Sequence, residues 1–218
     1  FVIIKKFDRK FSKTKSTDFI KKILEKKLKN YRISNLNQKL NIFKKFKVDF
    51  VINKKFDKKF SKIKCNKFIS EIIYKKLNPK IIFVSNNFRF GNKREGDVKL
   101  LKLLEKKYNY KIINPPTLKK KNKTISSSLI RKLLADGKLN LANIYLNRNW
   151  SIEGMVKKGR NIGKKIGFPT CNIDIGNYVI ARPGVYAVKV NILNNNKILK
   201  GIANLGYRPT FNQKKILL

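Results

Sequence analysis

The chain has 218 residues, of which 54 are Lys or Arg, 12 are Asp or Glu and none is His, so its formal net charge is +42. This length suffices for one or two domains with a buried core, and a hydrophobic content of 42% excludes a wholly disordered chain. The lack of His excludes mechanisms that need an imidazole base or metal ligand. The sequence has no run of about 18 apolar residues, so we expect no membrane span. It has no early apolar segment either, so we expect no secretory signal. Two cysteines, Cys65 and Cys171, predict neither a disulfide framework nor a zinc site. We expect a cytoplasmic protein without a membrane partner; composition does not determine its oligomeric state.

The kind of basic residue argues against a specific nucleic-acid partner. Only 9 basic residues are Arg, 45 are Lys, and 26 residues are Asn. Arg binds phosphates and base edges better than Lys does, and the lysines are spread along the chain instead of forming one stripe. We therefore interpret the charge as AT-rich codon composition with a solvated Lys surface. A basic RNA-associated protein is the alternative that stays open.

The front of the chain contains an internal repeat. Residues 1–28 recur at residues 50–77, a constant offset of 49, with 18 identities in 28 positions. Each copy predicts a short strand, a loop and a helix, and the second helix has an apolar face formed by Phe68, Ile69, Ile72, Ile73 and Leu77. Between the copies, residues 37–46 predict a short helix. Two copies are too few for a solenoid, so we treat residues 1–30 as a duplicated segment and expect the first copy to have no position in the sheet.

Strands and helices alternate from residue 80 onward. The predicted strands are a buried one at 80–84 and one at 110–116 that ends at two prolines. Between them we expect an amphipathic helix at 98–108 with Leu100, Leu101, Leu103 and Leu104. A basic loop at 117–124 follows, then a helix capped by serines 126–128 and closed by Gly137, and a short helix at 139–146. This alternation predicts a parallel α/β sheet. We assign residues 31–148 to this domain.

Near Trp150 the helical periodicity ends and glycine and β-branched residues become frequent. Residues 151–156, 168–175, 184–193 and 197–205 predict successive strands, with a hairpin tip at 194–196. The sequence therefore predicts an all-β module at residues 149–218.

A glycine-rich basic segment begins this module. Its glycines are Gly154, Gly159, Gly163 and Gly167, and its cations include Lys157, Arg160 and Lys165. Glycines let a phosphate approach the backbone, and the cations neutralise its charge. In the extended segment that follows, Thr170 and Asn172 should share one face, where two neutral oxygens suit Mg²⁺ that bridges nucleotide phosphates. Cys171 should point to the opposite face and be buried. Ordinary turn chemistry is the alternative for Thr170 and Asn172.

Two further segments are candidate anion or ligand sites. Ser127 lies at a helix start and Arg131 one turn further in, so the segment could bind an anion; plain helix capping is the alternative. Residues 86–97 follow a predicted parallel strand, where α/β sheets bind ligands; a loop plugged by aromatic side chains is the alternative.

Taken in order, these segments resemble the prokaryotic bifunctional riboflavin kinase/FMN adenylyltransferase family, also called FAD synthetase. VSNNFRFGNKREGD is similar to its V-G-x-[DN]-F-x-F-G-x-x-R-x-G-D loop, and ISSSLIRKLLADGKLNLAN to its I-S-S-T-x-I-R helix. EGMVKKGRNIGKKIGFPTCN is similar to the family signature that ends in G-F-P-T-A-N, and GVYAVKV and GIANLGYRPTF match the strands after it. The resemblance extends from about Tyr31 to Phe211. It implies an α/β nucleotidyltransferase domain with a Rossmann-like parallel sheet, followed by an all-β riboflavin-kinase barrel.

The resemblance also implies substrates and site residues. The first domain would transfer AMP from ATP to FMN, and the second would transfer the ATP γ-phosphate to riboflavin. By motif, Asn87, Ser127 and Arg131 would contact ATP or its phosphates in the first site. In the second site Thr170 and Asn172 would hold Mg²⁺, with Gly159, Gly163 and Lys165 near the nucleotide.

The chain departs from the family pattern at catalytic positions. Without His it has no H-x-G-H motif, and the family's catalytic Glu is expected on a strand beyond Leu218. Ser85 replaces a motif Gly and Ser128 a motif Thr. We therefore expect a fragment with both domains incomplete, and we name no catalytic residue. A catalytically inactive flavin- or nucleotide-binding fragment is the alternative.

Overall fold

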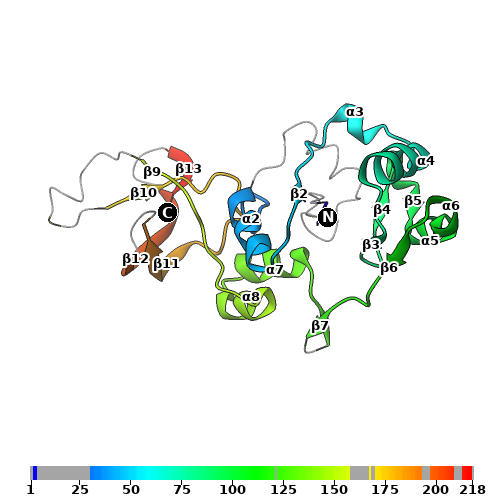
Figure 1. The fold of residues 1–218 in the computed structure, drawn as a ribbon. Helices are drawn as coiled ribbons and strands as arrows, with labels where there is room; N and C mark the ends of the chain where they lie inside the picture. Colours follow the sequence, from blue (N-terminus) through cyan, green and yellow to red (C-terminus); the bar gives the residue numbers. More distant parts are fainter. Residues whose placement is uncertain are drawn as a thin grey trace. The chain divides into compact units, whose positions relative to one another are not determined.

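A computed structural model of the chain describes residues 2–3, 30–120, 122–157, 167, 170–192, 197–208 and 213–217 (Figure 1). The chain divides into two compact units. The first comprises residues 1–28 and 40–126, and the second comprises residues 29–39 and 127–218. Each unit has a hydrophobic core of its own. Within the described ranges, no helix is long and apolar enough to cross a membrane.

A short parallel sheet organises the first unit. Strand β3 (Ile81–Phe83) pairs in parallel with β6 (Lys111–Ile113), and Ile82 lies opposite Ile112. The predicted parallel pairing is confirmed. Full burial of the first strand is wrong, because Ile81 and Phe83 are 51% and 68% exposed. Alternate residues of a strand point to opposite faces, and only the face of Ile82 and Ile112 packs on the core.

The helical part of the second repeat copy packs on that core. It consists of α3 (Lys58–Ser61), α4 (Cys65–Lys67) and the π-helix η1 (Phe68–Leu77). Of the predicted apolar face, Ile69 and Ile73 are fully enclosed. The rest of the core is contributed by Phe90, Val98, Leu101, Tyr110 and Ile112.

The predicted helix 98–108 is interrupted. It forms α5 (Val98–Leu103) and α6 (Glu105–Tyr108), which meet at the non-helical Leu104. Leu101 is buried, but Leu103 is exposed, so its predicted place on the apolar face is wrong. Each residue advances a helix by about 100°, so Leu103 lies about 200° from Leu101 and faces solvent.

The two repeat copies contact each other through their strands. Strand β1 (Val2–Ile3) pairs in parallel with β2 (Val51–Ile52), and equivalent residues of the two copies are paired. These two strands form a two-stranded sheet of their own, so the expectation that the first copy has no position in the parallel sheet of β3 and β6 stays a prediction. The same apolar Val-Ile dipeptide provides both strands. The predicted helix between the copies is confirmed as α2 (Leu36–Lys45).

Short hairpins replace two predicted loops. Strands β4 (Arg89–Phe90) and β5 (Gly96–Asp97) pair around the 3₁₀ turn η2 (Asn92–Arg94). Strands β7 (Lys119–Lys120) and β8 (Lys123–Thr124) pair within the predicted basic loop.

Two helices that the sequence predicts begin the main part of the second unit. Helix α7 (Ser127–Ala135) ends before Gly137, whose φ is 75°. The backbone N–H groups of Gly137 and Lys138 donate to the carbonyls of Leu134 and Leu133, which is a Schellman ending. Helix α8 (Leu139–Leu146) follows. Both helices share a core with residues from 175 to 205. The predicted domain limits, 1–30, 31–148 and 149–218, stay a prediction.

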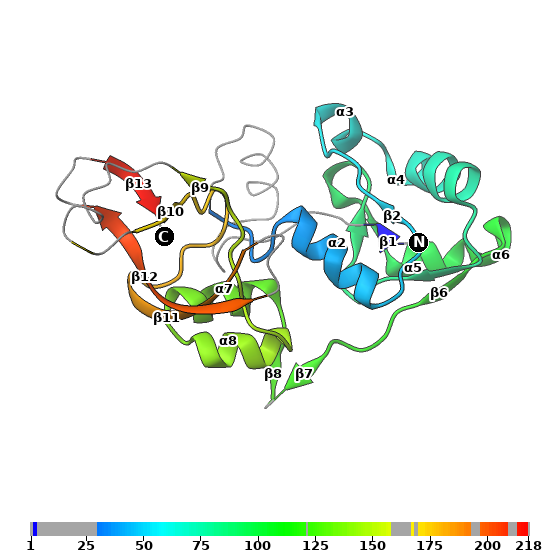
Figure 2. The same ribbon diagram turned by 60° about the vertical axis from the view of Figure 1, so that its left-hand side comes forward.

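The strands of the predicted all-β module are antiparallel. Strand β9 (Val156–Lys157) pairs with β10 (Asn172–Ile173), and β11 (Gly184–Asn191), β12 (Ile198–Arg208) and β13 (Gln213–Leu217) form a three-stranded sheet (Figure 2). The hairpin tip at 194–196 lies outside the described residues, but the strands on both sides of it pair. Strand β13 was not predicted. A closed barrel stays a prediction.

Candidate functional site

A tight turn at the carboxyl end of β3 is the first candidate site. The backbone N–H of Phe88 donates to the carbonyl of Ser85 (2.9 Å), which closes the turn. Ser85, Asn86 and Asn87 are exposed. The carboxyl ends of parallel strands form the edge at which α/β sheets bind ligands. The predicted ligand residue Asn87 therefore lies at the expected edge of the sheet.

Hydrogen bonds fix both asparagine side chains of this turn. Asn114, directly after β6, donates its Nδ2 to Oδ1 of Asn86 (2.8 Å). The hydroxyl of Ser85 donates to Oδ1 of Asn87 (2.9 Å). Both amide oxygens thus accept bonds from the protein, and the two NH₂ groups are presented as donors on an exposed surface. An array of donors suits an anionic ligand.

Sequence analysis missed Asn114. The available signal was its position. Asn114 directly follows β6, and Asn86 and Asn87 stand shortly after β3, the strand parallel to it. Carboxyl ends of neighbouring parallel strands lie side by side, so polar residues at both ends meet.

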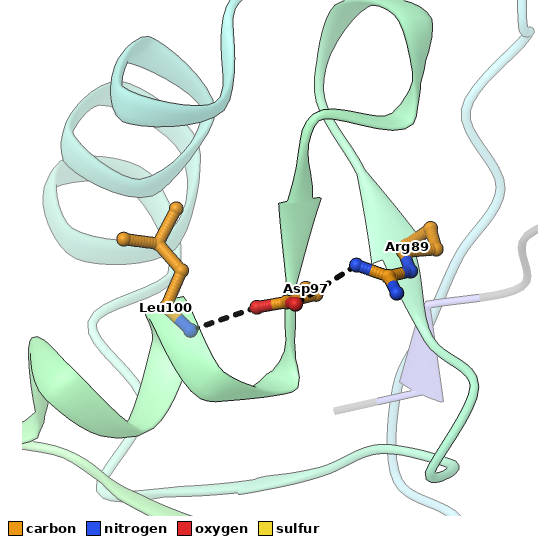
Figure 3. A network of polar contacts seen from close by, with 3 residues as sticks. All are labelled: Arg89, Asp97 and Leu100. Carbon is orange, nitrogen blue, oxygen red and sulfur yellow. Dashed lines mark hydrogen bonds and ion pairs between the residues drawn. The ribbon is translucent and has the colours of Figure 1, made fainter.

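The hairpin after the turn is held by Asp97, as Figure 3 shows. Its carboxylate accepts the backbone N–H of Leu100 (2.9 Å) at the start of α5 and the guanidinium of Arg89 (2.8 Å). The N–H of Leu100 and the charge of Arg89 lower the pKa of Asp97 below its ordinary value. The carboxylate is therefore ionised at neutral pH, and its charge is balanced within the hairpin.

Aromatic rings and a glycine attach the hairpin to the second repeat copy. Phe90 is buried, and its ring lies 5.7 Å from that of Phe88 and 5.5 Å from that of Phe68. Gly91 approaches the backbone of Cys65 so closely that a Cβ atom would lie 2.7 Å from the Cys65 nitrogen. Phe90 thus plugs the loop with a buried aromatic ring, as the alternative to a ligand site expects, whereas Asn86 and Asn87 are exposed.

The first cysteine also contacts this hairpin. The Cys65 backbone N–H donates to the carboxylate of Glu95 (2.6 Å). Burial, followed by the negative charge of Glu95, raises the pKa of the Cys65 thiol. The thiol is therefore held in its neutral form, and Glu95 is engaged by the protein.

The other two predicted ATP residues belong to the second unit. Ser127 is the exposed first residue of α7. Arg131 is only 2% exposed, and its Nε donates to the carbonyl of Tyr31 (2.8 Å). That Asn87, Ser127 and Arg131 bind one ATP stays a prediction.

The predicted kinase residues are partly described. Gly159, Gly163 and Lys165 lie outside the described residues. Asn172 begins β10 and is 7% exposed, while Thr170 precedes the strand and is exposed. Cys171 is exposed as well. The expected burial of Cys171 is wrong, because it lies before the short β9–β10 pair and not within it.

A buried polar network, also missed by sequence analysis, attaches residues 30–39 to the rest of the second unit. The Tyr178 hydroxyl donates to Oε1 of Gln38 (2.9 Å), and Nε2 of Gln38 donates to the Ser151 carbonyl (3.0 Å). Burial raises the pKa of Tyr178. The Tyr178 hydroxyl therefore stays neutral and serves as a hydrogen-bond donor to Gln38.

Comparison with known proteins identifies the family. The FAD synthetase family model matches residues 23–129, and the riboflavin kinase family model matches residues 146–218. Bifunctional riboflavin kinase/FMN adenylyltransferase from Buchnera aphidicola subsp. Schizaphis graminum is 39% identical over 84% of this chain. The chain belongs to this FAD synthetase family.

Two further proteins are similar to the chain. The Haemophilus influenzae protein is 36% identical over 83% of this chain. The chain spans 59% of the Buchnera protein and 58% of the Haemophilus protein. A solved structure from Streptococcus pneumoniae, described as a macrolide-efflux protein, is 26% identical, covers 85% of this chain and 59% of its own length, and has a TM-score of 0.71.

Proposed function

We propose that the protein acts in flavin cofactor biosynthesis, using ATP to phosphorylate riboflavin to FMN and to adenylylate FMN to FAD. The observation that supports this most directly is the order of the two family matches, FAD synthetase and then riboflavin kinase, along one chain. The exposed donor groups of Asn86 and Asn87 at the carboxyl edge of the parallel pair support ATP as the ligand of the first domain. With no membrane-spanning helix among the described residues, a cytoplasmic location is part of the proposal.

In the predicted nucleotidyltransferase domain, residues 31–148, Asn87, Ser127 and Arg131 would bind ATP or its phosphates. The amide of Asn87 is already oriented by Ser85. Because the chain contains no His, it lacks the histidine motif to which the family resemblance assigns stabilisation of the transferring phosphate. We therefore propose the adenylylation step for the whole protein, and we expect the 218 residues on their own to bind ATP without adenylylating FMN.

In the second domain, a riboflavin-kinase barrel would hold Mg²⁺ through Thr170 and Asn172, with Gly159, Gly163 and Lys165 near the nucleotide. Among the described residues no group of three or more His, Cys, Asp or Glu could hold a metal. The Thr170 hydroxyl and the Asn172 amide oxygen are hard neutral ligands, so this donor set fits a cation whose other ligands are ATP phosphates and water. Mg²⁺ bound there would neutralise charge on the transferring phosphate.

Product analysis tests the proposal. The purified chain is incubated with ATP and Mg²⁺, and with riboflavin or FMN, and flavins are separated by chromatography. Conversion of riboflavin to FMN would support a functional kinase domain. Pyrophosphate release from ATP and FMN above a boiled control would contradict the expected loss of adenylylation. Saturable flavin and ATP binding without product would favour the inactive binding fragment.

A salt titration distinguishes the RNA-associated alternative. The formal charge of +42 predicts weak, salt-sensitive RNA binding by simple counterion release. Sequence-selective RNA binding that persists at high salt, with no flavin binding, would contradict the proposed function.

A further inference from the structure

Two hydrogen bonds determine which groups the turn after β3 offers to a ligand. Asn114 and Ser85 each donate to the side-chain oxygen of an asparagine, the first to Asn86 and the second to Asn87. An asparagine amide has one acceptor oxygen and two N–H donors. Because both oxygens face protein donors, both NH₂ groups are available to a ligand, and neither is hydrogen-bonded to an acceptor among the described residues.

The surroundings of the turn are compatible with an anion. The loop 84–97 contains two acids, Glu95 and Asp97. Glu95 accepts the backbone N–H of Cys65, and Asp97 is paired with Arg89. Donor groups without uncompensated negative charge bind phosphate oxygens, since hydrogen bonds to a charged partner are stronger than neutral ones.

We propose that Asn86 is a second phosphate-binding residue of the ATP site beside Asn87, and that Asn114 is its positioning residue. The inference rests on the proposed function, which makes ATP the ligand at this edge. Asn114 acts through Asn86: its Nδ2 keeps the Asn86 oxygen turned toward β6 and the Asn86 NH₂ group toward the phosphates. Without Asn114, the Asn86 amide is free to present its oxygen, which repels phosphate.

The test measures binding of three probes to the full chain by calorimetry: ATP, inorganic pyrophosphate and adenosine, all without Mg²⁺. The variants are Asn86→Leu, Asn114→Leu and the double variant. Asn41→Leu is the matched control, because Asn41 is an exposed asparagine of α2 in the same unit. Asn114→Ala is the second variant should Asn114→Leu fail to fold.

Each single variant should weaken ATP and pyrophosphate binding about tenfold, the loss of one hydrogen bond to a charged group. Adenosine binding and the melting temperature should stay unchanged. The double variant should bind no more weakly than Asn86→Leu alone, because Asn114 acts only through Asn86. A structural role would instead affect adenosine and ATP alike.

Two results would overturn the inference, and they are distinguishable. If the unaltered chain binds ATP but Asn114→Leu and Asn114→Ala bind it equally well, the positioning role is wrong and the proposed function stands. If the unaltered chain binds neither ATP nor pyrophosphate, the proposed function fails together with the inference.

Discussion

Gly91→Ala should destabilise the first unit, because Gly91 is where the hairpin after the candidate site meets the second repeat copy. Its backbone has φ 76° and ψ 175°, a conformation essentially restricted to glycine. A side chain at such a position costs about 1–3 kcal/mol in backbone strain alone. The added Cβ would also lie 2.7 Å from the nitrogen and 2.8 Å from the Cα of Cys65. Backbone atoms cannot rotate away, so the hairpin would have to move. We expect a loss of at least about 2 kcal/mol.

Gly176→Ala is the matched control. Gly176 also has a positive φ, 52°, but no atom lies within 4 Å of the point that its Cβ would occupy, so the change reports backbone strain without a clash. Because Gly176 lies in the second unit, the comparison also tests whether each change acts within its own unit.

Thermal unfolding with two probes measures these effects. Trp150, the single tryptophan, reports the second unit, where its indole N–H donates to the Ile33 carbonyl. Far-UV circular dichroism reports both units. Gly91→Ala should lower the transition of the first unit by about 8 °C or more, at roughly 4 °C per kcal/mol, and leave Trp150 fluorescence unchanged. A shift below about 4 °C would refute the packing argument.

Four further results are expected. Leu134→Ala should cost about 2–5 kcal/mol, measured by Trp150 fluorescence in urea, because the Leu134 side chain is fully buried; a smaller loss would mean that the core collapses around the cavity. Asp97→Ala should lower the melting temperature more than Asp97→Asn, because Asn keeps an acceptor for the Leu100 N–H. The pKa of Asp97 is lowered on folding, so its stabilisation should be present at neutral pH and decline as the pH falls below its ordinary value of 3.8; a flat acid profile of wild type relative to Asp97→Asn would contradict this. Iodoacetamide should label the exposed Cys171 before Cys65, whose thiol pKa is raised, and peptide mass spectrometry would show the opposite order if the burial argument were wrong.

Local sequence patterns predicted the type and order of most elements. Helices α2, α7 and α8 lie within about two residues of their predicted limits, because caps and apolar spacing are local signals. Local patterns anticipated neither the break in the predicted helix at Leu104 nor the pairing of β1 with β2, which joins residues 49 positions apart.

The candidate site divides in the same way. The place of Asn87 shortly after β3 could be predicted because it belongs to a motif that follows a strand, whereas its role as a ligand stays a prediction. The bonds from Ser85 and Asn114 could not, because amide orientation depends on partners, one of them 28 residues away. Cys171 shows the converse error: alternation predicts burial only inside a strand, and the strand begins one residue later, at Asn172.

Fluorescence anisotropy of riboflavin, titrated with the purified chain in the presence of ATP and Mg²⁺, tests the flavin-biosynthesis assignment most directly. The chain should raise the anisotropy in a saturable way, and Asn172→Ala should weaken the dependence on ATP and Mg²⁺, because Asn172 is a proposed metal ligand of the kinase domain. Cys171→Ala, a change at the neighbouring exposed residue, should leave the titration unchanged. If riboflavin keeps the anisotropy of the free flavin at every protein concentration, the assignment is contradicted.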